Sequence, residues 1–322
     1  MILEDDVFNP APLPKLRVLN QLPSNPEGKG GRFPSWLHRS LPKGKSLSKT
    51  NHILEKYGLN TVCEEAKCPN RLHCFSHKTA TFLALGKACT RNCGFCDIDF
   101  TKTPLALEAD EPERIALSVA ELGLKHVVIT MVARDDLPDG GGEQMGQIIQ
   151  AVRLKNQECT IEVLTTDFEG RVESLDLVLN RHPEVFNHNI ETVRRISPRI
   201  RHKATYDTTL KMLQYAHASK KVSFVKSGLM VGLGETESEV FETLQDLKNA
   251  GCQIVTIGQY LQADKRKLLV KEFITPQQFK RYEEYGYLIG IPQMYAGPFV
   301  RSSFNAHEIK LLAGEKMALI EP

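Results

Sequence analysis

Six apolar, β-rich segments alternate with amphipathic helical segments along most of this 322-residue chain. Strands that are linked by helices pair in parallel, and their nearly continuous apolar character indicates that helices cover them. The C-terminal residues after 290 offer no convincing pair of further strands, so a closed eight-unit barrel is not expected. The sequence therefore predicts an α/β fold, an incomplete (β/α)6 TIM-like barrel. The expected strands are 79–86, 126–132, 160–166, 185–192, 223–233 and 253–260, and the expected helices are 112–124, 142–156, 171–181, 208–219, 236–250 and 275–290.

Four regions follow from this pattern and from the composition on either side of it. Residues 1–50 hold seven of the seventeen prolines and show no clear apolar period, which predicts an irregular N-terminal arm. Residues 51–78 form a cysteine-rich extension, and one short helix is expected between 46 and the cysteines. The barrel follows over 79–290, and 291–322 form an irregular C-terminal segment.

The charge of the chain is nearly balanced, with 41 Lys and Arg residues against 39 Asp and Glu residues. The basic residues are scattered, so the composition indicates neither a nucleic-acid nor a membrane partner. No apolar run is long enough to span a bilayer, and the N-terminus carries acidic residues where a signal peptide carries basic ones. We therefore expect a soluble, cytoplasmic protein, in which clustered cysteines act as metal ligands or catalytic thiols rather than disulfides.

Six of the eight cysteines lie within 63–96 as two groups of three. The other two, Cys159 and Cys252, each begin an apolar β-rich run, and we expect them to be small buried hydrophobic residues. The clustered cysteines therefore carry the chemistry that the sequence indicates.

The second cysteine group, Cys89, Cys93 and Cys96, has the spacing C-x3-C-x2-C in the loop after the first expected strand. In barrels of this kind the active site lies beyond the C-terminal ends of the strands. Three thiolates from one tight loop can hold a four-iron cluster and leave one iron open for a substrate or cofactor. The alternative is a structural zinc site that takes its fourth ligand from His73 or His77.

The spacing of the second group, with Phe95 just before the last cysteine, resembles the signature of the radical S-adenosylmethionine (SAM) superfamily. In that superfamily the open iron binds the amino and carboxylate groups of the methionine moiety. An electron from the reduced cluster then cleaves a carbon–sulfur bond and yields a radical that abstracts hydrogen from unactivated carbon. The resemblance implies that the cofactor itself is the missing fourth ligand.

The first cysteine group, Cys63, Cys68 and Cys74, has the spacing C-x4-C-x5-C. Three cysteines this close indicate a metal site, although the spacing alone does not identify the metal. Together with the second group and four further segments in the same order, it resembles the lipoyl synthase family, from about Pro34 to about His307. These segments are RDDLPDGG (134–141), FNHNIETV (186–193), SGLMVGLGE (227–235) and GPFVRSSF (297–304).

The resemblance implies two [4Fe–4S] clusters. The second cysteine group would hold the cluster that cleaves SAM, and the first group would hold an auxiliary cluster that donates sulfur. In the family, a serine in an Arg-Ser-Ser-Tyr segment supplies the fourth ligand of the auxiliary cluster.

The corresponding segment of this chain is Arg301-Ser302-Ser303-Phe304. We assign the ligand to Ser303 and keep Ser302 as the alternative. A serine oxygen holds iron more weakly than a thiolate does, which suits a cluster that comes apart in use. Phe304 lacks the hydroxyl of the family's tyrosine, so we expect an adjusted local contact with function retained. Without the cysteine groups, both serines would be interpreted as loop hydroxyls that cap nearby backbone.

Residues near the strand ends are the expected contacts to SAM. The glycines of GLMVGLGET allow the backbone to approach a ligand closely, although a tight turn is the alternative. The resemblance implies that Asn189 and Glu191 hold the cofactor. The alternatives are a helix cap for Glu191 and a satisfied core histidine for His188. The Gly-Gly-Glu string at 141–143 is interpreted as the start of the next helix, and Asp135 as a further candidate contact. The predicted contacts are Thr130, Arg134, Asn189, Glu191, Gly232 and Gly234.

The resemblance implies insertion of two sulfur atoms at C6 and C8 of a protein-bound octanoyl-lysine. The implied partners are octanoylated lipoyl carrier domains, such as E2 subunits of 2-oxoacid dehydrogenases or a glycine-cleavage H protein, an electron donor such as ferredoxin or flavodoxin, and an iron–sulfur carrier protein. Arg194 and Arg195 either form a solvated face or help to dock an acidic carrier. Two alternatives remain: another sulfur-inserting radical SAM enzyme with a small-molecule substrate, and a non-catalytic iron–sulfur electron carrier or metal sensor.

Overall fold

The computed structural model describes residues 34–38, 46–76 and 81–303. The chain divides into two units, Met1–His38 and Arg39–Pro322. In the first unit the described residues form a short 3-10 turn, η1 (Ser35–Leu37). The second unit contains the sheet and both cysteine groups.

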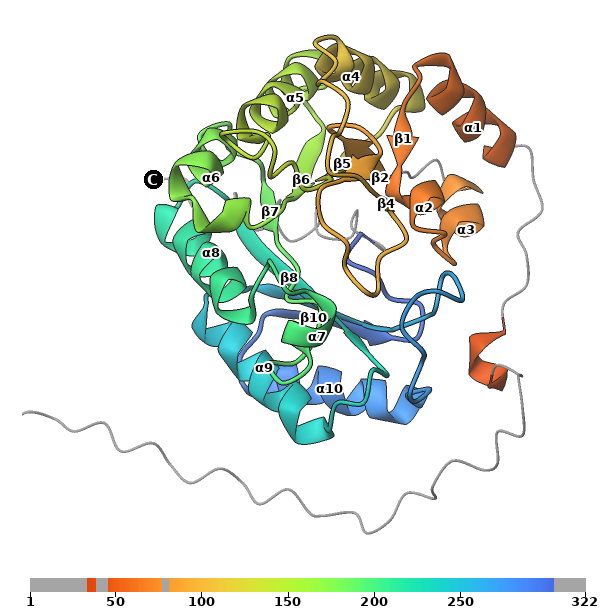
Figure 1. The fold of residues 1–322 in the computed structure, drawn as a ribbon, viewed down its shortest axis with the longest axis vertical. Coiled ribbons are helices and arrows are strands. Elements are labelled where there is room, and N and C mark those ends of the chain that lie inside the picture. Colours follow the sequence, from red (N-terminus) through yellow and green to blue (C-terminus); the bar gives the residue numbers. More distant parts are fainter. Residues whose placement is uncertain (1–33, 39–45, 77–80, 304–322) are drawn as a thin grey trace, which may run out of the picture. The chain divides into compact units, whose positions relative to one another are not determined.

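Eight strands of the described residues form one sheet in the order β1-β2-β5-β6-β7-β8-β9-β10. All neighbours from β2 to β10 are parallel, and only β1 pairs antiparallel, through Asn60↔Leu83 and Thr61↔Phe82. Figure 1 shows the sheet curving into an open barrel with helices around its outside. The prediction of an incomplete parallel barrel is confirmed. The strands are β1 (Asn60–Thr61), β2 (Thr81–Ala84), β5 (His126–Met131), β6 (Thr160–Leu164), β7 (Val185–Asn187), β8 (Phe224–Val231), β9 (Ile254–Gln259) and β10 (Gln293–Gly297).

The outer helices agree with the expected segments to within a few residues. Their start signals act as the sequence indicates: the side chain of Thr236 caps α9 in a capping box with Glu239, and Thr275 caps α10. The start of α5 at Gly142 confirms that Gly142 and Glu143 open a helix. The outer helices are α4 (Glu111–Leu122), α5 (Gly142–Lys155), α6 (Val172–Leu179), α8 (Tyr206–Ser219), α9 (Glu237–Asn249) and α10 (Pro276–Leu288).

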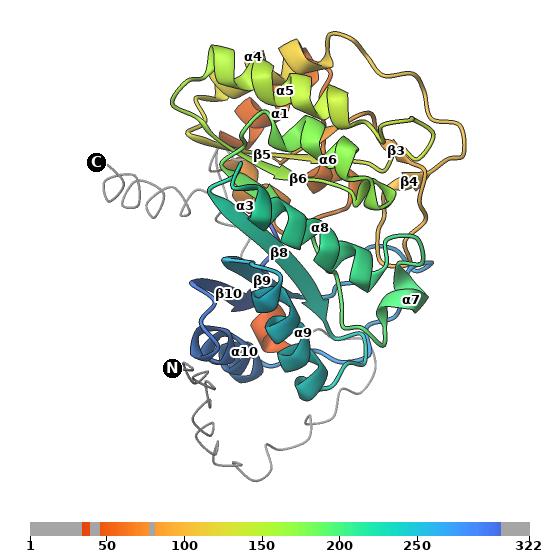
Figure 2. The ribbon, with the colours of Figure 1, turned by 90° about the vertical axis from the view of Figure 1, so that its left-hand side faces the viewer.

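Shorter elements surround the cysteine groups. Figure 2 shows β3, β4 and α7 at the end of the barrel toward which the β8 arrow points, which is the C-terminal end of the strands. These elements are α1 (Ser46–Lys56), α2 (Val62–Glu65) and α3 (Arg71–Ser76) around the first group, and β3 (Ala88–Cys89), β4 (Asp99–Phe100), η2 (Phe168–Gly170) and α7 (Ser197–Ile200) at the strand ends.

Several elements differ from the expectation: α1, β1, α2 and α3 replace the one short helix expected before and around the first cysteine group, and β3, β4, β7 and β10 also differ. β10 was not predicted, because a segment of five residues is too short to show a clear apolar pattern. Its strand geometry comes from parallel pairing with β9. β7 ends at Asn187 instead of 192, since Glu191 has a left-handed backbone with φ of 68° and forms only an isolated bridge to Leu229.

The barrel interior contains a buried ionic pair beneath its C-terminal end. Lys226 of β8 donates to Glu162 of β6 at 2.9 Å, and Asn187 donates to the same carboxylate at 3.0 Å. Cys159 and Cys252 are buried and lie outside any disulfide, as expected. Within the part of the chain that the structure describes, no helix is long and apolar enough to cross a bilayer.

Candidate functional site

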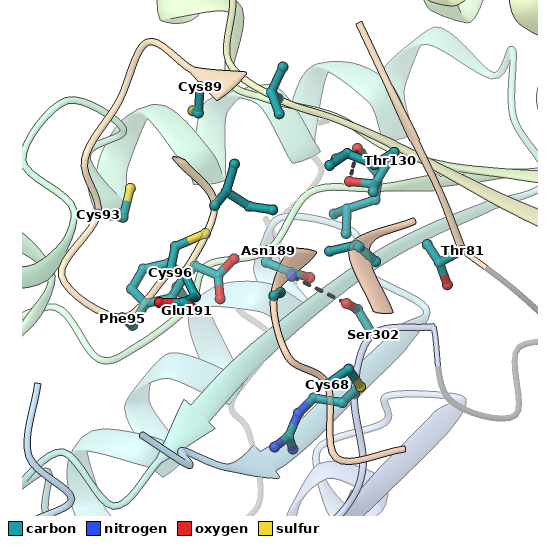
Figure 3. Close-up of a pocket in the computed structure, with 18 of the residues that line it drawn as sticks. Cys68, Thr81, Cys89, Cys93, Phe95, Cys96, Thr130, Asn189, Glu191 and Ser302 are labelled. Carbon is teal, nitrogen blue, oxygen red and sulfur yellow. Dashed lines mark hydrogen bonds between the residues drawn. The ribbon is translucent and has the colours of Figure 1, made fainter. Parts of the chain in front are cut away.

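A cavity of about 510 Å³ lies at the C-terminal ends of the strands and is lined by residues of both cysteine groups. Cys89, Cys93 and Cys96 line it, and so do Cys63 and Cys68. Figure 3 shows Asn189 and Ser302 between the cysteines of the second group and Cys68. Segments that are far apart in the sequence therefore share one site.

Cys74, the third member of the first group, does not line this cavity. It lies on α3, is partly buried, and packs against the hydrophobic core. The structure thus places two of the three cysteines of the first group at the cavity wall and the third one behind them.

The loop of the second cysteine group is closed by pairing of β3 with β4, in which Cys89 pairs with Phe100. Gly94, in the middle of the loop, accepts a hydrogen bond from the amide of Leu268 and donates one to the carbonyl of Ile200. The sulfur of Cys89 accepts from the backbone amides of Arg91 and Ala133, both at 3.4 Å. Such donors to a ligand sulfur tune the potential of an iron–sulfur cluster.

Arg91 fixes this loop to the neighbouring strand ends. Its buried guanidinium contacts Asp135 through both Nε and Nη2, the latter at 2.7 Å, and Asp167 through Nη1 at 2.6 Å. Burial raises the pKa of Asp167, but the charge of Arg91 outweighs it and the pKa lies below its usual value. Neither Arg91 nor Asp167 was predicted from the sequence. The available signal was an arginine inside the loop of the second cysteine group, with carboxylates after two strands.

The donor set fits an iron–sulfur cluster. Burial raises the pKa of Cys93 to about 11 and that of Cys96 to about 12, so without a metal both are neutral thiols at pH 7. A bound metal supplies the positive charge that converts such thiols to thiolate ligands. In the described residues no three His, Cys, Asp or Glu side chains converge on one metal ion. Three thiols spread around a cavity of this size suit a cluster, which is larger than a single ion.

The serine segment reaches the same cavity from the end of β10. Arg301, Ser302 and Ser303 all line it. The side-chain amide of Asn189 donates to Ser302 Oγ at 3.4 Å. Ser303 therefore faces the cavity that Cys63 and Cys68 also face, while Phe304 lies outside the described residues.

Three of the six expected cofactor contacts, Thr130, Asn189 and Glu191, line the cavity. Burial raises the pKa of Glu191, and Arg201 partly offsets this effect. His188, which also lines the cavity, is a satisfied histidine: Nδ1 pairs with the carbonyl of Thr165 at 2.8 Å. Burial and the charge of Arg201 lower the pKa of His188 to about 4, so its ring is neutral.

The other three expected contacts lie outside the cavity lining. Arg134 is buried and donates to Asp136 and to the carbonyl of Leu85. Gly232 has φ of 99° and packs against the Gln259 side chain, and Gly234 has φ of 100° in the same turn. Both glycines have the positive φ that a tight turn uses, and their contact with SAM stays a prediction.

Comparisons with known proteins agree with this geometry. Residues 83–247 match the family model of the radical SAM superfamily, and 16–68 match the N-terminal domain of lipoyl synthase of the radical SAM family. A lipoyl synthase of Protochlamydia amoebophila is 61% identical over 95% of this chain and 98% of its own length. The chain belongs to the lipoyl synthase family. A second lipoyl synthase, from Chlamydia muridarum, is 54% identical over 86% of this chain and 90% of its own length.

Solved structures share the fold of this lipoyl synthase family member at low sequence identity. Streptococcus suis SuiB bound to its precursor peptide SuiA matches with a TM-score of 0.53 at 12% identity, over 78% of this chain and 52% of that one. The FeFe-hydrogenase maturase HydG from Carboxydothermus hydrogenoformans matches with a TM-score of 0.51 at 13% identity, over 84% and 78%. Membership of the radical SAM superfamily implies an iron–sulfur cluster and SAM as cofactors.

Proposed function

We propose that this chain inserts sulfur at C6 and C8 of an octanoyl-lysine on a lipoyl carrier protein. The observation that supports this function best is the single cavity that both cysteine groups and the serine segment line. A sulfur donor and a radical generator must reach the same acyl chain, and a shared cavity meets that requirement.

We assign one [4Fe–4S] cluster to Cys89, Cys93 and Cys96. A second cluster is assigned to the first cysteine group with Ser303. When bound, the first cluster with SAM supplies a radical that removes hydrogen from unactivated carbon, and the second supplies sulfur. The residues that we propose for the second cluster are Cys63, Cys68, Cys74 and Ser303.

The residues of the chain orient the reactants and exclude water. Asn189 and Glu191 line the cavity together with the cysteines and offer polar contacts to SAM, and Arg91 holds the loop of the second group in place. Apolar side chains elsewhere in the lining suit an eight-carbon acyl chain, which needs no polar partner along its length. They include Val62, Leu83, Met131, Leu164, Met230 and Leu261.

The proposed protein partners follow from this activity. The substrates would be octanoylated E2 subunits of 2-oxoacid dehydrogenases or a glycine-cleavage H protein in the cytoplasm. A ferredoxin or flavodoxin would donate electrons, and an iron–sulfur carrier protein would rebuild the auxiliary cluster. Arg194 pairs with Asp207, and Arg195 with Glu239, which favours a solvated face over a carrier contact for both arginines.

The test is anaerobic incubation of reconstituted protein with SAM, a low-potential reductant and an octanoyl-lysine peptide. Mass spectrometry should show that the peptide gains two sulfur atoms and loses hydrogen. Cys68→Ala should cleave SAM without adding sulfur, and Cys93→Ala should do neither. Cleaved SAM with an unchanged peptide in the wild type would refute the proposed substrate.

A further inference from the structure

Asn70 lies between the second and third cysteines of the first group and is only 1% exposed. Its side-chain amide donates a hydrogen bond to the backbone carbonyl of Phe299 at 2.7 Å, across 229 residues of sequence. Its own backbone carbonyl accepts from the amide of Cys74 at 2.9 Å. One residue thus connects the cysteine segment to the chain that leads into Ser302 and Ser303.

The segment from Phe299 to Ser303 makes three further contacts. A turn in which the amide of Val300 donates to Gly297 follows directly after β10. The backbone of Val300 then lies against β9, because a Cβ atom at Gly258 would overlap the Val300 carbonyl oxygen. Beyond it, Ser302 accepts from Asn189. The segment therefore crosses the barrel mouth between β9, β7 and the first cysteine group.

Among these contacts, Asn70 supplies the one that joins the serine segment to the first cysteine group. We propose that Asn70 is a positioning residue of the auxiliary-cluster site, and that its amide sets the serine hydroxyl at the reach of the metal that the cysteines hold. This inference rests on the proposed function, which assigns that cluster to the first group and Ser303. Asn70 itself touches no reacting atom.

The need for such a residue follows from the ligand chemistry. A serine oxygen is a weaker ligand for iron than a thiolate, so little binding energy is available to pull a loosely held segment into place. Three cysteines come from one short stretch of chain, but the serine comes from the opposite end of the barrel sheet. Partners that orient a ligand from behind contribute strongly to metal affinity. A buried amide held in one rotamer by its surroundings meets this need.

The experiment uses the full chain with Cys89, Cys93 and Cys96 replaced by Ala, so that iron is retained only at the auxiliary site. Asn70→Asp is introduced in this background, because a carboxylate has the same shape as the amide but no hydrogen to donate. We expect the affinity of the auxiliary site for iron, measured by competition with a chelator, to fall about 10–100-fold. Ser303→Ala should have the same effect. Asn70→Gln, which keeps a donor on a longer chain, should restore part of the retention.

Asn156→Asp is the matched control, since Asn156 also donates from its side chain to a backbone carbonyl, that of Ala116, far from the cavity. It should leave iron retention unchanged. Hydrogen exchange of the metal-free chain gives a second readout: Asn70→Asp should speed exchange in the peptide 298–303 and leave that of β6 unchanged. This result also separates a local effect from misfolding.

Two results would overturn the proposal. Asn70→Asp that retains iron as well as its parent chain would show that the contact does not position the serine. Equal exchange in 298–303 with and without the Asn70 amide would show that the segment is held by its other contacts. A parent chain that retains no iron at all would instead refute the auxiliary site of the proposed function, and with it the basis of this inference.

Discussion

The side-chain amide of Asn189 donates to the hydroxyl of Ser302, although 113 residues separate them in the sequence. Asn189 follows β7, where we expect SAM, and Ser302 stands next to the serine that we assign to the auxiliary cluster. The proposed SAM site and the proposed auxiliary-cluster site are therefore adjacent. That relationship makes the two serines separable by experiment.

Ser303→Ala should lower the iron retained by the auxiliary site, because it removes the proposed oxygen ligand. Ser302→Ala removes only the acceptor for Asn189 and should keep this iron. Iron content and visible absorption of chains lacking Cys89, Cys93 and Cys96 measure the difference. The opposite ranking of the two variants would move the ligand assignment to Ser302.

Asp167→Asn should weaken the ion pair with Arg91 that attaches the loop of the second cysteine group to the strand ends. It removes the charge that faces Arg91 Nη1 at 2.6 Å and should lower the free energy of unfolding by about 2–3 kcal/mol. Urea unfolding of the metal-free protein measures this loss. Asp264→Asn is the control: its partner Arg266 is 85% exposed, and solvent screens the pair, so little change is expected. Equal losses of unfolding free energy in the two variants would contradict this role of Asp167.

Glu162→Gln should destabilise the barrel by about 3–5 kcal/mol at pH 7, because it leaves the Lys226 ammonium buried without its charged partner. Burial raises the pKa of Glu162, but Lys226 and His126 outweigh burial, and the pKa lies below its ordinary value of 4.5. The stability from this pair is therefore full above about pH 4.5 and is lost as the pH falls through the lower pKa of the folded state.

Unfolding free energies measured from pH 7 to pH 3 should thus show the gap between wild type and Glu162→Gln closing only in acid. Glu113→Gln removes an exposed partner of Lys155 and serves as the control with little effect. A gap that is constant across this range would contradict the assigned role of the carboxylate.

Gly232→Ala and Gly234→Ala form a matched pair in one turn. Both substitutions place a Cβ atom on a backbone with positive φ, which destabilises the folded state by about 1–2 kcal/mol. Only at Gly232 would the Cβ also overlap Gln259 and the carbonyl of Glu272, whereas at Gly234 it meets Lys271 at an ordinary 3.7 Å. Thermal unfolding should rank Gly232→Ala as clearly less stable. If instead both retain stability and lose affinity for SAM, the glycines contact the cofactor directly.

Much of the fold was predictable because it depends on local patterns. Apolar runs and capping signals such as Thr236 placed the strands and outer helices, and parallel pairing followed from their alternation. The cysteine spacings likewise predicted two groups near one site, because the members of each group are close in the sequence, and five of the six cysteines line the cavity.

The sequence by itself therefore determined the barrel class, the ligand types and the family that the chain resembles. Only the tertiary structure decided which distant residues meet: Asn70 with Phe299, Asn189 with Ser302, and Arg91 with Asp167. It also left Arg134 and Gly232 out of the cavity lining, although both follow strands that lead toward the cavity. The physical reason is that a strand pattern fixes which edge of the sheet a residue reaches, whereas side-chain partners depend on the close packing of segments with no sequence relation.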